Sequence, residues 1–105
     1  EPRRYEWHVG SMIVPPAGWQ HQHFNTGTTP TRYLAFKHEA VSLRNTQGVP
    51  KAWISKRLGG DQIDYADEKP LIRTLFAEAL AKNGLQPKME EAYNAELADL
   101  PPLGV

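Results

Sequence analysis

The sequence predicts a mainly β protein that ends in helices. Short runs rich in aromatic and apolar residues, separated by Gly and Pro, fill the first 40 residues, and such runs are typical of antiparallel strands. An apolar stripe at helical spacing follows from about residue 70. The chain of 105 residues has the length of one small domain. We expect a β part over residues 1–65 and a helical extension over 66–105.

Four segments read as strands, namely 5–9, 11–14, 19–25 and 32–38. In the first, Tyr5, Trp7 and Val9 fall on one face, because successive side chains of a strand point to opposite sides. The turn between the second and third contains Pro16 and Gly18, of which Gly supplies a positive φ. With one or two further short strands before residue 66, the prediction is a partial antiparallel barrel of about 4–6 strands, since closed small barrels need about eight.

Helical signals begin at Pro70, a residue suited to a first turn, with Asp67 and Glu68 before it as expected caps. Six apolar residues then form a stripe: Leu71, Ile72, Leu75, Phe76, Ala79 and Leu80. We expect this stripe to cover the sheet or a neighbouring subunit. Asn83-Gly84 is a stop signal. A second helix is expected over 87–98, with Met89, Tyr93 and Leu97 on one face.

Charge is balanced overall but divided along the chain. Residues 1–60 hold eight basic and three acidic residues, a net +5, and residues 61–105 hold four basic and nine acidic residues, a net −5. The halves are expected to attract within one chain or between subunits, with solvated faces as the alternative. Zero net charge disfavours nucleic acid and anionic membranes as partners, and no apolar run approaches the about 20 residues of a membrane span. Without Cys there are no disulfides or thiolate metal sites, and we expect a cytoplasmic location.

The segment that most clearly indicates a functional site contains two histidines. In a strand over 19–25, His21, His23 and Asn25 share one face. Two imidazoles at positions i and i+2 converge on one metal ion, and imidazole suits Fe, Zn, Cu and Ni. The alternative is that one histidine binds the metal while the other lines a pocket.

The two histidines lie within a motif whose residues have fixed spacing. Gly10, Pro16, Gly18, His21 and Asn25 follow the pattern G(X)5PXG(X)2H(X)3N. The pattern resembles the second conserved motif of the cupin superfamily. The stretch GWQHQHFNTGTTPTRYLAF resembles the later half of bacterial double cupins related to the gentisate dioxygenases, and GGDQIDYADEKPLIRTLFAEAL looks like the linker and helix that follow the barrel in some of them.

The resemblance implies a partial cupin barrel (a double-stranded β-helix, or jelly roll) with His21 as a metal ligand. His23 lies outside the fixed pattern and is a second ligand or a catalytic acid/base, whereas Asn25 is structural. The implied function is that of a metal-dependent cupin, a non-haem iron dioxygenase-like enzyme acting on a small aromatic or hydroxy acid. Fe(II) is the expected metal, with Mn, Ni or Zn as alternatives. The competing hypothesis is a non-catalytic cupin half that serves as a fold or oligomer scaffold or binds a small molecule.

The first cupin motif, G(X)5HXH(X)3,4E(X)6G, is absent from the chain. The resemblance therefore implies that a companion chain or a preceding segment supplies the missing ligands, in a homo- or hetero-oligomer. The opening EPRRYEWHVG already reads as a strand, which favours a piece of a longer or split protein over a tag or natural trimming. Some further residues have open roles: His8 and His38 as ligands or surface histidines, Arg32 and Gln62 as substrate contacts, and Trp7, Trp19 and Phe36 as core or pocket wall.

Overall fold

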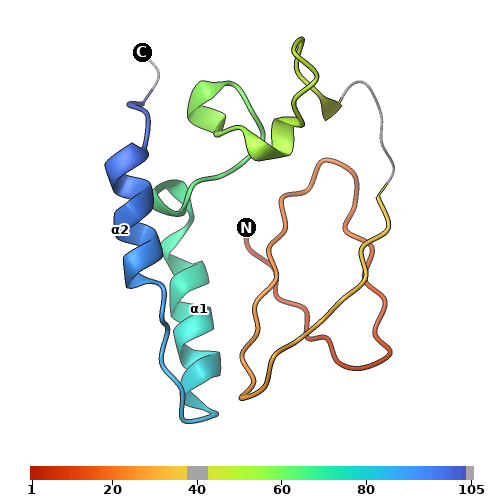
Figure 1. Cartoon of the computed structure of the whole chain (residues 1–105). Coiled ribbons are helices and arrows are strands. Elements are labelled where there is room, and N and C mark those ends of the chain that lie inside the picture. Colours follow the sequence, from red (N-terminus) through yellow and green to blue (C-terminus); the bar gives the residue numbers. More distant parts are fainter. Residues whose placement is uncertain (38–42, 104–105) are drawn as a thin grey trace. The chain divides into compact units, whose positions relative to one another are not determined.

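The regular elements of this chain are helical. A computed structural model describes residues 1–37 and 43–103, and Figure 1 shows their path. The described elements are three 3-10 helices and two α-helices: η2 (Lys51–Trp53), η3 (Lys56–Leu58), η4 (Tyr65–Asp67), α1 (Pro70–Ala81) and α2 (Glu90–Asp99). His38, a candidate ligand at the end of the fourth predicted strand, lies outside the described residues.

The chain divides into two compact units, each formed by two stretches of sequence. The first unit combines Glu1–Thr31 with Lys69–Leu85 and contains α1. The second combines Arg32–Glu68 with Gln86–Val105 and contains the three 3-10 helices and α2. The expected domain boundary at residue 65 stays a prediction.

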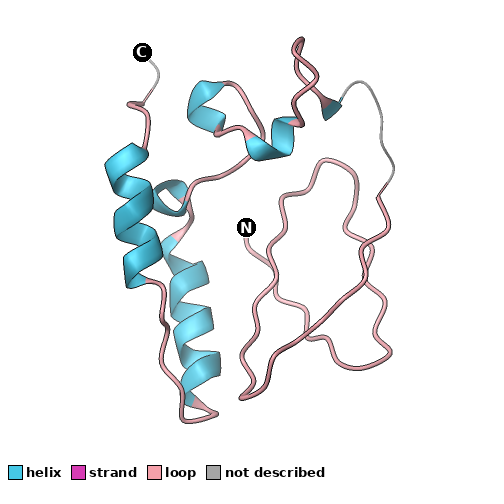
Figure 2. Ribbon diagram, in the orientation of Figure 1, coloured by secondary structure: helices cyan, strands magenta, loops and turns pink. Residues whose placement is uncertain are grey.

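The prediction of a mainly β fold is wrong. Figure 2 shows loop and turn over residues 1–37, where the four strands were expected. In the rest of the described chain, strand-type pairing is limited to two isolated bridges, Arg44 with Pro50 and Ser55 with Gln62. The described residues therefore form no sheet, and neither a β-barrel nor a jelly roll is present among them.

The reason is that alternating residue types report a local preference, whereas a sheet requires a partner strand for its N–H and C=O groups. Two backbone hydrogen bonds in this segment each close a local turn. Ser11 N–H donates to the His8 carbonyl (2.9 Å), and Trp19 N–H donates to the Pro16 carbonyl (3.1 Å). Neither bond joins two of the predicted strands. An uncovered sheet of a few short strands is marginal in water, so turn propensity alone does not produce one.

Helix α1 follows the sequence closely. It begins at Pro70 as predicted, and Lys69 takes the N-cap position without a side-chain cap. Of the two acidic residues expected as caps, Asp67 binds Arg57 instead. Past its end, Gly84 adopts a φ of +70°, which confirms the stop signal. Ala79 and Leu80 are the buried apolar residues of the described chain. The end of the apolar stripe is thus buried, whereas Leu71 at its start is exposed, and Phe76 packs against Phe24 of a loop and not against a sheet.

Helix α2 begins at Glu90, three residues later than expected. Its less exposed side chains recur at helical spacing, at positions 89, 93, 96 and 100. Leu97, which was expected to share a face with Met89 and Tyr93, is 59% exposed. Glu96 occupies that face instead. Neither α1 nor α2 is long and apolar enough to cross a membrane.

Candidate functional site

Two tight turns precede the histidine pair, which we define as His21 and His23. Gly10 and Gly18 each occupy the third position of a four-residue turn, with φ of +87° and +80°. This left-handed conformation favours glycine, because a Cβ would meet the backbone there. The predicted positive φ at Gly18 is confirmed. The glycines of the motif therefore shape the backbone that leads into the pair.

The segment after the pair is anchored to α1 within the first unit. Phe24 lies with its ring centroid 4.9 Å from that of Phe76 on α1. Asn83, just after α1, donates from Nδ2 to the Thr26 carbonyl (2.7 Å). Asn25 donates to the Thr29 carbonyl (2.8 Å) and accepts from Gly27 N–H (3.0 Å), which agrees with its expected structural role. The pair thus lies between a tight turn and a loop that is tied to a helix.

The two rings of the pair lie side by side. Their centroids are 5.6 Å apart, and the ring planes meet at 82°. Trp7 contacts the same cluster, with its ring 6.0 Å from that of His23. Both histidine side chains are exposed, so a solute has access to them.

The spacing of the pair suits a shared metal ion. Two imidazoles bound at about 2.0–2.1 Å to one tetrahedral ion place their ring centroids roughly 5 Å apart. The observed 5.6 Å is within reach of that value by small side-chain rotations. Among the described residues, however, no group of three or more His, Asp or Glu side chains is placed to hold a metal. The pair is a partial ligand set.

His8 and Glu6, the nearby candidate ligands, do not complete this ligand set. His8 lies with Nδ1 3.0 Å from the Val9 carbonyl oxygen, and Glu6 pairs with Arg4 (3.0 Å). The structure brings neither His8 nor Glu6 into a ligand cluster with the pair.

The remaining sequence candidates have other surroundings. The side chain of Trp19 is half exposed and lies under the Arg3 guanidinium, 5.3 Å from the ring centroid. Phe36 is 91% exposed, so its expected role in a core is wrong. Gln62 belongs to the second unit, where its backbone pairs with Ile54 and Lys56.

A polar network in the second unit was not found from the sequence. The Glu96 carboxylate accepts from the N–H groups of Tyr65 and Ala66, both at 3.0 Å. It therefore binds the start of η4 from the covered face of α2. The Tyr93 ring packs edge-on against Tyr65, with centroids 5.2 Å apart.

Arg57 connects three parts of the same unit. Its guanidinium donates to both Asp67 carboxylate oxygens at 2.7 Å and to the Pro101 carbonyl at 3.0 Å. Hydrogen bonding from Arg57 lowers the pKa of Asp67, and the same bond raises the pKa of Arg57. Nearby, Ser55 donates to the buried Asp64. These contacts join residues 9 to 44 positions apart, and no local pattern identifies them.

The hydrogen bonds of this network join parts of the second unit to one another, so its role is to stabilise the structure. The pair is the part of the first unit with exposed, chemically reactive side chains in mutual contact. No protein-family model matches the chain, and no curated protein or solved structure shows a significant similarity to it.

Proposed function

We propose that the chain binds a divalent transition-metal ion through His21 and His23. The observation that carries the proposal is the ring arrangement, 5.6 Å between centroids on two exposed side chains. Neutral imidazole is the commonest protein ligand for such ions. The anchored loop on one side and the tight turn on the other support the proposal, because they limit the conformational freedom that metal binding has to restrict.

Fe(II) remains the first choice of metal, with Mn, Ni and Zn as alternatives, and this order rests on the motif resemblance. A bound ion of this type supplies Lewis acidity at neutral pH. Within the proposal His21 and His23 hold the ion. A ring nitrogen of His23 that binds the metal cannot also carry a proton, so an acid/base role would require its other nitrogen.

Enzyme activity on a small aromatic or hydroxy acid is the further part of the proposal. It rests on the spacing of Gly10, Pro16, Gly18, His21 and Asn25, and it requires ligands that the pair does not supply. The alternative is a non-catalytic role in which the pair and its turns serve binding or assembly. Metal dependence of any activity separates the two, because a scaffold has no activity to lose on chelation.

Calorimetric titration with Zn(II), Ni(II) and anaerobic Fe(II) tests the metal site. We expect the double variant His21→Ala/His23→Ala to bind at least tenfold more weakly than the native chain, and His8→Ala to bind as the native chain does. His8 is the matched control, since it is an exposed histidine of the same segment outside the pair. Equal affinity of the native chain and the double variant would refute the proposal.

A further inference from the structure

We infer that the metal site is shared between two copies of this chain, with His21 and His23 from each copy around one ion. This inference rests on the proposed function. It names the source of the missing ligands as a second, identical histidine pair. The ligand count supports it: the described residues of one chain, which do not include His38, place two imidazoles together, whereas structural zinc sites bind four protein ligands. A two-fold axis through the ion doubles the pair to four.

The surface around the pair is suited to contact with itself. Residues 7–31 contain no Asp, Glu, Lys or Arg. In a two-fold interface each patch meets its own copy, so a charged patch would face like charge. Residues 7–31 bring no charge of their own to such a contact, and the guanidinium that lies over Trp19 comes from Arg3, outside this segment. Cores of protein interfaces are likewise depleted of charged residues.

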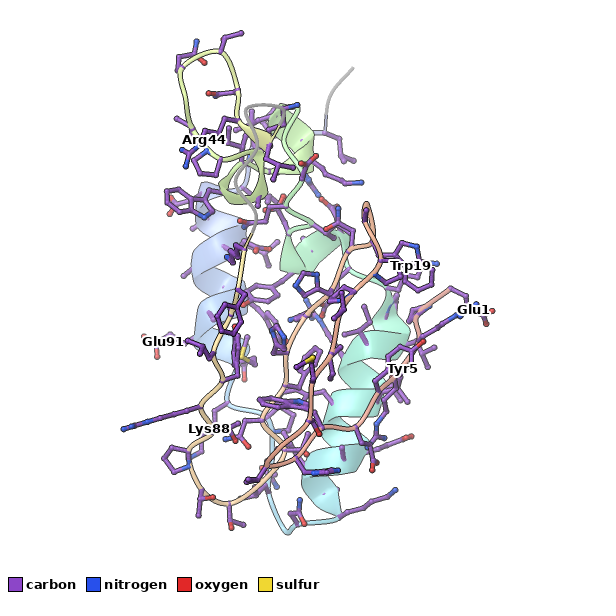
Figure 3. The ribbon with its side chains drawn as sticks, turned by 90° about the vertical axis from the view of Figure 1, so that its right-hand side faces the viewer. Glu1, Tyr5, Trp19, Arg44, Lys88 and Glu91 are labelled. Atoms are coloured by element: carbon purple, nitrogen blue, oxygen red, sulfur yellow. The ribbon has the colours of Figure 1, made fainter. Side chains whose placement is uncertain are left out.

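Apolar side chains of this segment, and of Tyr5 just before it, are exposed. Six of them have exposed fractions between 48% and 101%: Tyr5, Val9, Met12, Ile13, Val14 and Trp19. Figure 3 shows Tyr5 and Trp19 among the outward-lying side chains. Together the six expose on the order of 800 Å², which is the area that each partner contributes to an interface of standard size. A single copy leaves this surface in water at a cost that a second copy removes.

The total exposed area supports the same conclusion. The chain of 11.8 kDa exposes 9223 Å². A compact monomer of this mass exposes about 5,900 Å², and two separate compact units of half the mass expose about 7,100 Å² together. The exposed area exceeds that of two separate compact units by about 2,100 Å² per chain, so an interface of standard size, at about 800 Å² per partner, would cover part of it.

The test combines light scattering with metal analysis of the full chain, using Zn(II) as the probe and EDTA as the metal-free reference. We expect saturating Zn(II) to produce a dimer with one ion per two chains and to lower the dimer dissociation constant at least 100-fold. His21→Ala/His23→Ala should abolish the zinc effect, and His8→Ala should keep it. Met12→Glu, which places like charges at the contact, should weaken the dimer, whereas Leu97→Glu on the exposed face of α2 should not.

The outcomes separate this inference from the proposed function. A monomer that binds one ion per chain through the pair would overturn the shared site and leave metal binding intact. Zinc binding that is unaffected by the double variant would overturn both. A dimer whose ions are bound without His21 and His23 would also overturn the shared site, because the contact would then be apolar alone.

Discussion

The link between Glu96 and η4 allows a prediction with a magnitude. Glu96→Ala removes a carboxylate that accepts two backbone N–H groups at 3.0 Å each. Hydrogen bonds to a charged group contribute about 1.5–3 kcal/mol when buried. Both donors here retain access to water, with Tyr65 half-buried and Ala66 exposed, so water replaces part of the loss. We expect the free energy of unfolding to fall by about 2 kcal/mol.

Urea unfolding followed by near-ultraviolet circular dichroism measures this change, because Tyr65 and Tyr93 pack together in the same unit. Glu91→Ala is the matched control: it is the same substitution on the exposed side of α2, where Figure 3 shows the side chain projecting outward. We expect the control to change stability by about 0.5 kcal/mol or less. Equal losses for the two variants would refute the role assigned to Glu96, and Glu96→Gln, which keeps one acceptor oxygen, should fall between them.

Three further predictions follow from the other contacts. Zinc at 100 times its dissociation constant should stabilise the folded state by about 2.7 kcal/mol for each ion bound, measured by thermal unfolding, and the double-alanine variant of the histidine pair should show no such gain. Arg57 lowers the pKa of Asp67 from its ordinary 3.8, so the Arg57–Asp67 ion pair stabilises the fold above that value. This contribution is lost as the pH falls through the lowered pKa of Asp67. Urea midpoints between pH 7 and pH 2 should show this loss in the native chain and not in Asp67→Asn. Gly60→Ala places a Cβ against the Ile54 carbonyl and should unfold the surrounding loop, detected as a lower urea midpoint, whereas Gly18→Ala, with open space around it, should cost only about 1 kcal/mol.

The parts of the fold that local chemistry decides were predictable. Pro70 marks the start of α1 because its ring fixes φ and its missing N–H has no partner in a first turn. Gly84 marks the end of the same helix, and Gly18 adopts the positive φ that its turn requires. Each of these features depends on one or two adjacent residues, which is the range over which a sequence pattern is informative.

The parts that depend on distant partners were not predictable. Alternation in the first 37 residues indicated strands, but a strand exists only where another backbone pairs with it. The same limit applies to Glu96, which lies about 30 residues from the groups that it binds, and to Arg57, which is 44 residues from Pro101. Acidic residues before α1 suggested helix caps, yet Asp67 binds Arg57, a stronger bidentate partner than a helix N-terminus.

The candidate site has one feature that the local sequence determines and one that depends on a distant partner. The closeness of His21 and His23 follows from their two-residue separation and survives the loss of the predicted strand, since it requires no distant partner. Completion of the ligand set is a long-range property, as the sheet was. The segment of residues 7–31 presents a similar requirement: its apolar side chains are exposed to water, and the described part of one chain forms no group of three or more metal-ligating side chains around the pair. One partner that satisfies both requirements is a simpler solution than two. The ratio of metal ions to chains therefore tests the origin of the exposed surface as well as the identity of the site.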